Sequence, residues 1–320
     1  MEELDEKDFE KMFRMDRDSF GTLLGMVRPN LTTSHAQWLN SSGSIIDPKT
    51  KLAVAIRWLA GGAVHDICFS FGISKKSFYK RAGVLWTTLD AINDVLDISF
   101  PISDPEKLAE IEKGFASYSF GRLRGCVMAI DGWVVRCRQP SSSEVDNVSS
   151  FRNRKVFFGL VVMAGVDSDC RFQMLSCKSP GSTNDSIAWE YTSVFASLHK
   201  LPPEYYIIGD EGFVNIETCL TPYPGKNLQP YYDSFNYHLS RMRQNVERAF
   251  GILVRKWGIF WRPLVCSHCR WAPIITAASK LHNFCIDARL KKMKSINDSD
   301  NRAYEADIRH GDMLEINTTD

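Results

Sequence analysis

The chain has 320 residues, 44% of them hydrophobic and 24% charged, which is enough apolar material for two domains or for one large domain with an appendage. Its formal net charge of +1 excludes a uniformly basic surface, so any basic region must be local. We expect no membrane span and no signal peptide, and the nine cysteines, an odd number, indicate reduced thiols in a cytosolic or nuclear setting.

The first third of the chain has apolar residues at helical spacing. Residues 1–28 predict two short amphipathic helices with Asp16 or Asp18 as a cap, and the polar residues 29–48 predict a loop. Residues 49–95 predict three further helices, with a left-handed turn at Gly72 and an N-cap at Ser74. Residues 96–118 read as a mixed, partly acidic linker.

Residues 51–84 are also compatible with a helix-turn-helix. In this interpretation Ser74–Arg81 enters the major groove of DNA, and Lys75, Lys76 and Arg81 contact it. Many three-helix segments bind nothing, so a purely structural role for these residues stays open.

Strands and helices alternate after residue 122. Short apolar runs predict strands at 127–130, 156–166, 172–175 and 205–208, the first ending at Asp131 and the last at Gly209-Asp210. Helices are predicted from Ser182 or Asn184 to about 198, over 236–257 and over 273–290. We therefore expect an α/β fold with a mixed sheet flanked by helices over 119–292, an all-helical region over 1–118, and a polar, disordered tail over 293–320.

Three acids stand out in this pattern. Asp131 and Asp210 each close a predicted strand, and a glycine follows each within two residues. If the two strands are neighbours, the carboxylates converge at the rim of the sheet, where Mg²⁺ or Mn²⁺ would neutralise them. Glu247 lies at the edge of the buried stripe of the 236–257 helix. Turn aspartates, and a helix-surface pair of Glu247 with Arg243, are the structural alternatives.

The region around Glu247 is basic. Residues 236–292 hold eleven Lys and Arg against two acids, with tryptophans between them, a mixture that suits phosphate contacts and stacking. A solvated helix face with buried tryptophans is the alternative. Our candidate DNA contacts in this region are Arg241, Arg243, Arg248, Arg255 and Lys256.

Eight short motifs follow one another in a characteristic order. They are Ala129-Ile130-Asp131-Gly132, Asn153-Arg154-Lys155, Pro180-Gly181-Ser182-Thr183-Asn184-Asp185-Ser186, Gly209-Asp210-Glu211-Gly212-Phe213, Leu220-Thr221-Pro222-Tyr223, Asn236, Val246-Glu247-Arg248-Ala249-Phe250-Gly251 and Leu281-His282-Asn283-Phe284. In this order they resemble the Harbinger (PIF-type) transposases and their domesticated nuclease relatives, a branch of the DDE superfamily. The resemblance covers roughly residues 120–290.

The resemblance implies an RNase H-like core with Asp131, Asp210 and Glu247 as catalytic residues and ligands of two divalent ions, Mg²⁺ or Mn²⁺. Asp185 would cap a helix beside them. The activity implied is cutting and joining of phosphodiesters in double-stranded DNA at transposon ends or derived targets. We also expect a Myb-like DNA-binding partner protein, a homo-oligomer and a nuclear location.

Two residues depart from the family pattern, and two other functions remain open. Asn184 stands where relatives often have His, and Trp133 stands where a smaller residue is common. A domesticated or inactive relative that binds DNA or chromatin would look similar, and so would a DNA-binding adaptor that uses residues 51–84. A zinc site made by Cys266, His268, Cys269, His282 and Cys285 is disfavoured, because His282 and Cys285 lie in an apolar helical pattern.

Overall fold

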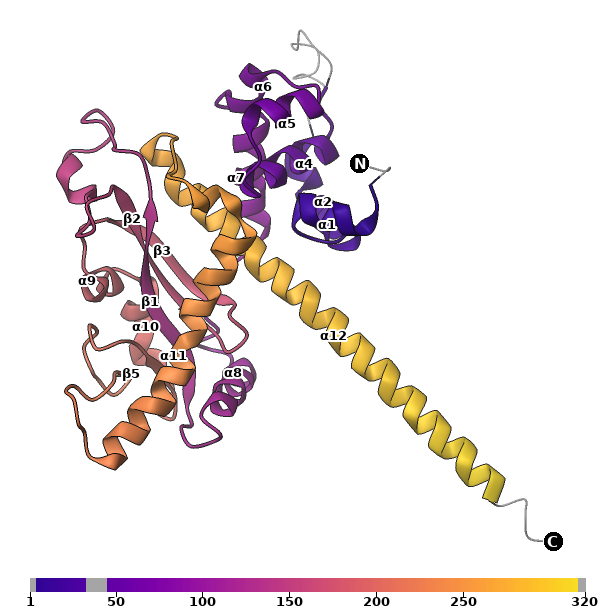
Figure 1. Cartoon of the computed structure of the whole chain (residues 1–320), viewed down its shortest axis with the longest axis vertical. Coiled ribbons are helices and arrows are strands. Elements are labelled where there is room, and N and C mark those ends of the chain that lie inside the picture. The colour runs from indigo at the N-terminus through magenta and orange to yellow at the C-terminus, as the bar shows by residue number, and fades with distance from the viewer. Residues whose placement is uncertain (1–3, 33–44, 316–320) are drawn as a thin grey trace.

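The computed structural model describes residues 4–32 and 45–315, with side chains through residue 296. A helical N-terminal region lies beside a sheet domain, and one long helix projects away from both (Figure 1). The N-terminal helices are α1 (Glu6–Phe13), α2 (Arg17–Leu31), α4 (Pro48–Leu59), α5 (Val64–Ser70), α6 (Lys75–Tyr79), α7 (Val84–Val95) and α8 (Pro105–Tyr118).

Side-chain caps begin most of these helices. Asp16 accepts the Ser19 N–H at 2.7 Å and Ser74 accepts the Ser77 N–H at 3.0 Å, so both predicted caps are present. Gly72 has the predicted positive φ, at +62°. The predicted loop at 29–48 begins later than expected, because α2 continues to Leu31, and residues 33–44 of it lie outside the described part.

Helix α8 corrects the sequence prediction, which read residues 96–118 as a linker. Asp104 caps the helix by accepting the Lys107 N–H at 3.1 Å, and Pro105 occupies its first turn, where a missing N–H costs nothing. Leu108 and Phe115 are buried. The surrounding charged residues hid this apolar spacing.

The sheet has five strands in the order β3-β2-β1-β4-β5. They are β1 (Cys126–Arg136), β2 (Gly159–Val166), β3 (Phe172–Pro180), β4 (Tyr206–Ile208) and β5 (Cys219–Leu220). The first three pair in antiparallel fashion, whereas β4 and β5 run parallel to β1. The mixed, helix-flanked sheet predicted from the sequence is confirmed, and its order is that of an RNase H-like fold. The two-residue strand β5 was not predicted.

Strand β1 is longer than the sequence suggested. Asp131 pairs with Ala164 in the middle of this strand, so the prediction that it closes the strand was wrong. The strand continues because Trp133, Val134 and Val135 keep pairing with β2. Residues up to Ile130 are buried and the next four are half-buried. Asp131 therefore stands where β1 passes from the core to a more open part of the sheet.

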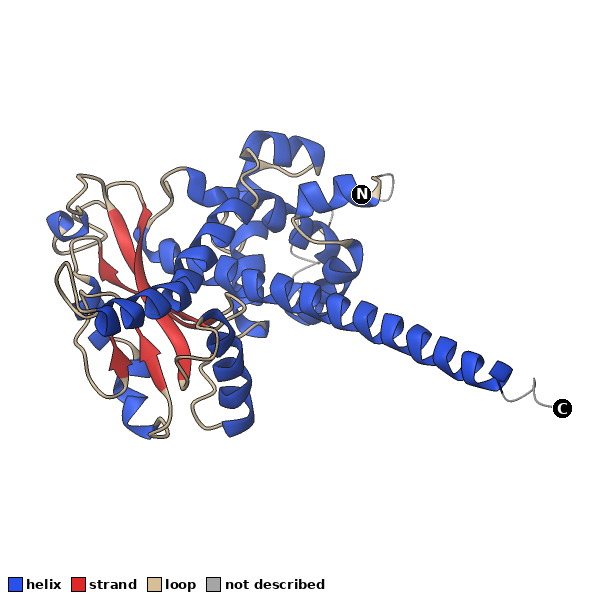
Figure 2. Ribbon diagram, turned by 60° about the horizontal axis from the view of Figure 1, so that its bottom comes forward, coloured by secondary structure: helices blue, strands red, loops and turns tan. Residues whose placement is uncertain are grey.

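Helices cover both faces of the sheet (Figure 2). Helix α11 (Pro230–Lys256) and the first half of α12 (Trp271–Glu315) pack on one face, where Val162 and Ala164 join their core. Helices α9 (Asp185–Glu190) and α10 (Ser193–Ser197) pack on the other, with Val161 and Met163. The predicted helix at 182–198 is thus broken in two, because Thr192 caps a new helix.

The C-terminal part also differs from expectation. Residues 293–315 were predicted to be disordered, but they continue α12 as helix, since this segment contains no proline and only one glycine, Gly311. The N-terminal helices share an apolar core with α12 and the sheet. Lys280 of α12 donates to the Asn93 carbonyl at 2.6 Å, which joins α12 to α7. Among the described helices, none is long and apolar enough to cross a membrane.

Candidate active site

Asp131 is on the face of β1 that meets α11. Side chains alternate along a strand, so Ala129, Asp131 and Trp133 share a face. The Trp133 ring lies 5.5 Å from Phe250 of α11 and 5.2 Å from Phe260, which explains how the chain accommodates a large residue here. Arg243 and Glu247 precede Phe250 on the same side of α11 by about two turns and one turn. The side chains of Arg243 and Glu247 therefore lie on the face of α11 that is directed toward Asp131.

Two further aspartates gather beside Asp131. Asp210 follows β4, the parallel neighbour of β1, and accepts the Gly212 N–H at 2.9 Å. Asp185 is the first residue of α9, and its carboxylate lies against Gly132: a Cβ at Gly132 would stand 2.0 Å from Asp185 Oδ1. Gly132 is thus required for the close approach of α9 to β1. Three carboxylates, from β1, α9 and the end of β4, are therefore near enough to affect one another's pKa.

The electrostatics of this cluster are those of crowded acids. The pKa of Asp131 is raised from 3.8 to about 6, first by burial and then by Asp210 and Asp185, although the Gly132 N–H and Arg243 act to lower it. Burial and Asp210 also raise the pKa of Asp185, which Arg154 lowers. Like charges in a half-buried site are costly unless a cation joins them.

Glu247 does not join the aspartates directly. Its carboxylate pairs with Arg243 Nη1 at 2.8 Å, and its side chain is 50% exposed. Arg243 is also close enough to Asp131 to lower the pKa of that acid. The guanidinium therefore pairs with Glu247 and also acts on the charge of Asp131. Within the described residues, no three His, Cys, Asp or Glu side chains already form a metal-binding set.

The candidate DNA contacts fall into two groups. Arg241 stacks on Phe120 at 4.5 Å, and Arg248 donates to Asn245 Oδ1 at 3.0 Å. Lys256 lies beside the Cys285 thiol of α12 and lowers its pKa. With Arg243, these four cations already contact other side chains of the protein. The other four are exposed and form no ion pair within the described residues: Lys75, Lys76, Arg81 and Arg255.

Several motif residues have roles that the sequence did not reveal. Asn283 accepts the Phe172 N–H and donates to the Phe172 carbonyl, both at 2.8 Å, and so fixes α12 to β3. Asn236 makes the same pair of bonds to Tyr223, at 2.8 and 3.0 Å. An isolated asparagine in a helical pattern was the available signal, because it needs a partner when it lies against another chain segment.

The cysteines and histidines of the zinc alternative do not form one metal-binding group within the described residues. His282 is buried and its Nε2 bonds the Cys170 carbonyl at 2.8 Å, while burial lowers its pKa to about 4. The Cys285 thiol contacts the Arg14 carbonyl at 3.9 Å, whereas Cys269 is exposed. Each of these residues has a separate structural setting.

Comparisons with known proteins match the part of the chain that holds these acids. A family model described as DDE superfamily endonuclease matches residues 130–283, the part that contains Asp131, Asp185, Asp210 and Glu247. The chain is 27% identical over 302 residues to "Protein ALP1-like" of Arabidopsis thaliana, covering 88% of this chain and 71% of that protein. No solved structure matches significantly. Residues 130–283 are thus similar to the DDE superfamily of endonucleases.

Proposed function

We propose that this protein is a metal-dependent DNA endonuclease of the Harbinger transposase type, with Asp131, Asp210 and Glu247 as its catalytic carboxylates. One observation carries the proposal: Asp131 is half-buried beside Asp210 and Asp185, and its pKa is raised to about 6. A fold tolerates such crowding at neutral pH when a cation is part of the site.

The residues of the site fit a hard divalent cation. Asp131 and Asp210 offer carboxylate oxygens from neighbouring parallel strands, and oxygen ligands suit Mg²⁺ or Mn²⁺. These two acids would hold the ions together with Glu247, and two ions are expected from the resemblance. When bound, such ions activate the attacking water or 3′-hydroxyl and stabilise the leaving oxygen of the phosphodiester.

The other side chains prepare the site. Arg243 holds Glu247 on the α11 face above β1 and offsets part of the charge of Asp131 before the site is loaded. Glu247 must leave Arg243 to join Asp131 and Asp210. The freed guanidinium is then available to a DNA phosphate. Asp185 stays against Gly132 and fixes the position of α9 beside Asp131.

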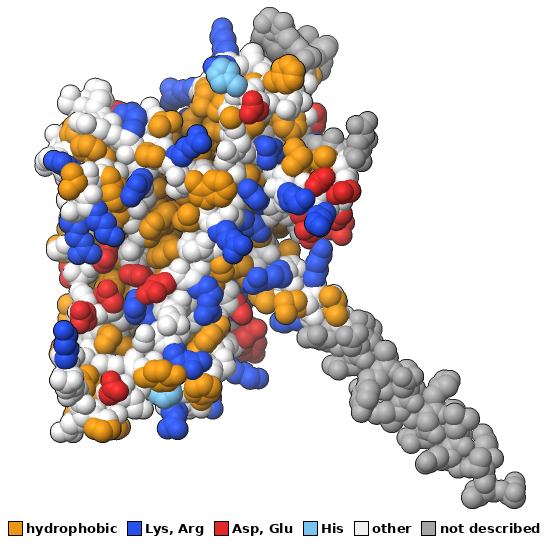
Figure 3. Space-filling view, in the orientation of Figure 1, with side chains coloured by type: hydrophobic (Ala, Val, Ile, Leu, Met, Phe, Trp, Pro, Cys, Tyr) orange, Lys and Arg blue, Asp and Glu red, His pale blue; other side chains and the backbone are white. Residues whose placement is uncertain are grey.

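The DNA path in this proposal follows the unpaired cations. Figure 3 shows acidic side chains gathered at mid-height of the sheet domain, with Lys and Arg side chains above and beside them. Arg255, two turns beyond Glu247 on α11, is exposed, and so are Lys75, Lys76 and Arg81 of the N-terminal region. Neutralised phosphates release counterions, so binding should weaken steeply with salt. A Myb-like partner protein, a homo-oligomer and a nuclear location complete the proposal on the basis of the resemblance alone.

Nicking of supercoiled plasmid tests this function. Purified wild-type protein should convert supercoiled into open-circular or linear DNA in Mg²⁺ or Mn²⁺. Excess EDTA should stop this conversion. Asp131→Asn should abolish nicking, while Asp169→Asn, a substitution outside the cluster, should retain it. Activity that persists in EDTA, or in Asp131→Asn, rules the proposed chemistry out.

The Arg243–Glu247 ion pair favours a second candidate, a domesticated relative that binds DNA or chromatin without cutting. In that case the 2.8 Å pair would be the permanent state of the third acid. DNA binding that is normal in wild type, with no nicking in either metal and no stabilisation by Mn²⁺, would select this candidate.

A further inference from the structure

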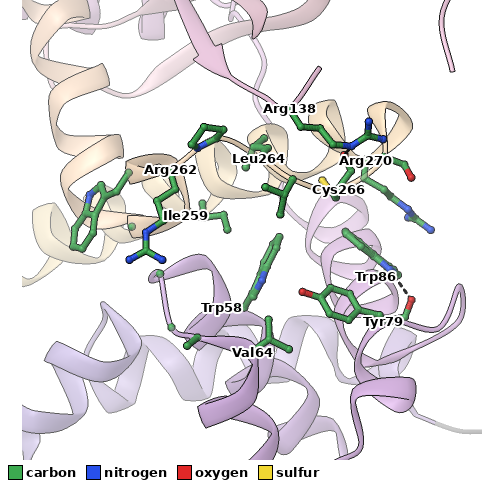
Figure 4. A pocket seen from close by; sticks show the side chains of 18 of the residues that line it. Trp58, Val64, Tyr79, Trp86, Arg138, Ile259, Arg262, Leu264, Cys266 and Arg270 are labelled. Carbon is green, nitrogen blue, oxygen red and sulfur yellow. Dashed lines mark hydrogen bonds between the residues drawn. The ribbon is translucent and has the colours of Figure 1, made fainter. Parts of the chain in front are cut away.

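A cavity of about 870 Å³ lies between the N-terminal helices and residues 258–270, the segment that follows α11. The chemistry proposed above does not use it. Figure 4 shows Trp58, Tyr79 and Trp86 from α4, α6 and α7 on one side, and Ile259, Arg262 and Leu264 on the other. Its volume is that of a pocket for one compact ligand, since such pockets measure roughly 300–1,000 Å³.

Flat aromatic rings form one wall of this cavity. Trp58 and Trp86 are buried and meet edge to face, with ring centroids 6.2 Å apart. The Trp86 indole N–H donates to the Tyr79 carbonyl at 3.2 Å, which fixes α7 against α6. Tyr79 is 45% exposed. A planar apolar group could therefore stack at the opening without disturbing the wall.

The polar groups of the cavity are donors. No Asp or Glu lines it, whereas three arginines do. Arg138 is satisfied by Glu144, at 2.5 and 2.6 Å, and Arg270 stacks on Trp86 at 4.6 Å. Within the described residues, the Arg262 guanidinium, the Tyr79 hydroxyl and the Trp58 indole N–H form no hydrogen bond or ion pair. An anionic ligand rich in acceptors would satisfy all three.

Exposed cations lie on and next to α6, the helix that contributes Tyr79 to the cavity. Lys75, Lys76, Lys80 and Arg81, which we call the α6 basic edge, are exposed and form no ion pair in the described structure. Tyr79 belongs to the same helix, so the α6 basic edge and the cavity are continuous. A polyanion that follows this edge arrives at the aromatic wall.

We propose that this cavity binds an unpaired nucleotide of a DNA strand, with its base against Tyr79 and a phosphate at Arg262. The inference rests on the proposed function only in taking DNA as the substrate. Bases stack on aromatic rings whatever their sequence, and phosphates pair with arginine. A duplex is too wide for a cavity of this volume, so the site is specific for a single strand, an overhang or a flipped base.

Fluorescence anisotropy with the full chain tests the proposal. The probes are a fluorescein-labelled oligothymidine of about ten nucleotides and a blunt duplex of equal length, both in EDTA so that no cutting occurs. Tyr79→Leu should weaken single-strand binding about tenfold, as expected when one stacked base is lost. Arg262→Gln should lower the slope of log affinity against log salt by about 0.7. Tyr231→Leu and Arg28→Gln, exposed residues that do not line the cavity, are the matched controls.

The outcomes separate this inference from the proposed function. Selective loss of single-strand binding in Tyr79→Leu and Arg262→Gln, with unchanged thermal unfolding, supports it even if the protein does not cut. Binding equal to that of the controls overturns it, and so does equal loss with the duplex. A peptide of Asp and Phe that binds the cavity, when the oligothymidine does not, assigns the site to a protein partner and overturns it as well.

Discussion

Replacing Asp131 by Asn should make the metal-free protein more stable above pH 6. The pKa of this carboxyl is raised from 3.8 to about 6, so ionising it in the folded protein is disfavoured. At about 1.4 kcal/mol for each tenfold change in acidity, this rise corresponds to about 3 kcal/mol. The folded protein holds the proton more tightly than the unfolded chain does. The loss of folding stability caused by ionising Asp131 is therefore absent below about pH 4 and complete above about pH 6.

Asparagine removes the charge and keeps the one hydrogen bond. Its side-chain oxygen can still accept the Gly132 N–H, which is 2.8 Å from Asp131 Oδ1. Because part of the carboxylate is open to solvent, we expect a gain in the free energy of unfolding of about 2 kcal/mol at pH 8, and less at pH 5. This raises Tm by roughly 4 °C or more. Thermal and urea unfolding in EDTA at the two pH values measure both quantities.

Asp167 provides the matched control, because burial also raises its pKa to about 6. Its carboxylate, however, accepts hydrogen bonds from the Asp169 and Arg171 N–H groups, both at 2.9 Å, and from Gln173 Nε2 at 2.7 Å. Asp167→Asn would lose acceptors and should destabilise the protein by about 1–3 kcal/mol. If Asp131→Asn lowers stability at pH 8 as Asp167→Asn does, Asp131 is a structural acid and the argument for a cation site is refuted.

Three further predictions concern DNA and the fold. Glu247→Gln should retain or slightly raise DNA affinity in a gel-shift assay while abolishing nicking, because it removes a charge and a metal ligand together. Arg255→Ala should lower the salt slope of duplex binding by about one unit, whereas Lys256→Ala should leave it unchanged, since Lys256 lies beside Cys285. Asn283→Ala breaks two buried bonds to Phe172 and should lower the free energy of unfolding in urea by about 2 kcal/mol.

Each of these predictions has a contrary result. Normal nicking by Glu247→Gln would make that acid only the partner of Arg243. An unchanged salt slope in Arg255→Ala would move the DNA path away from the end of α11. Full stability in Asn283→Ala would mean that the α12–β3 contact is held by apolar packing alone.

Much of the sheet domain could be predicted because its strands are short apolar runs. The runs ending at Ile130 and Ile208 are buried on both faces, and such strands stand out from their surroundings. Helix α11 could be predicted equally well, because its apolar residues recur at intervals of three and four. Strand β5 has only two residues, which is too short for an alternation of apolar and polar residues to be recognised in the sequence. The extension of β1 beyond Asp131 depends on pairing with β2, which is a long-range contact.

The candidate site was predictable as a set of acids but not as an arrangement. Parallel pairing of β1 with β4 brings Asp131 and Asp210 together, as their strand contexts suggested. The place of Asp185 depends on how closely α9 approaches Gly132, which local sequence does not specify. Glu247 pairs with the i−4 arginine on its own helix, whereas the proposed function gives it a metal across the sheet as a second partner. Their relative stability depends on whether the cation is present.

Anomalous diffraction from crystals soaked in Mn²⁺ tests the central claim most directly. The account predicts Mn²⁺ peaks within ligand distance of the Asp131 and Asp210 carboxylates, about 2.0–2.2 Å for small hard divalent cations, with Glu247 released from Arg243 to complete the site. Crystals that show no peak at Asp131, or a peak there with the Arg243–Glu247 pair still closed, would contradict it.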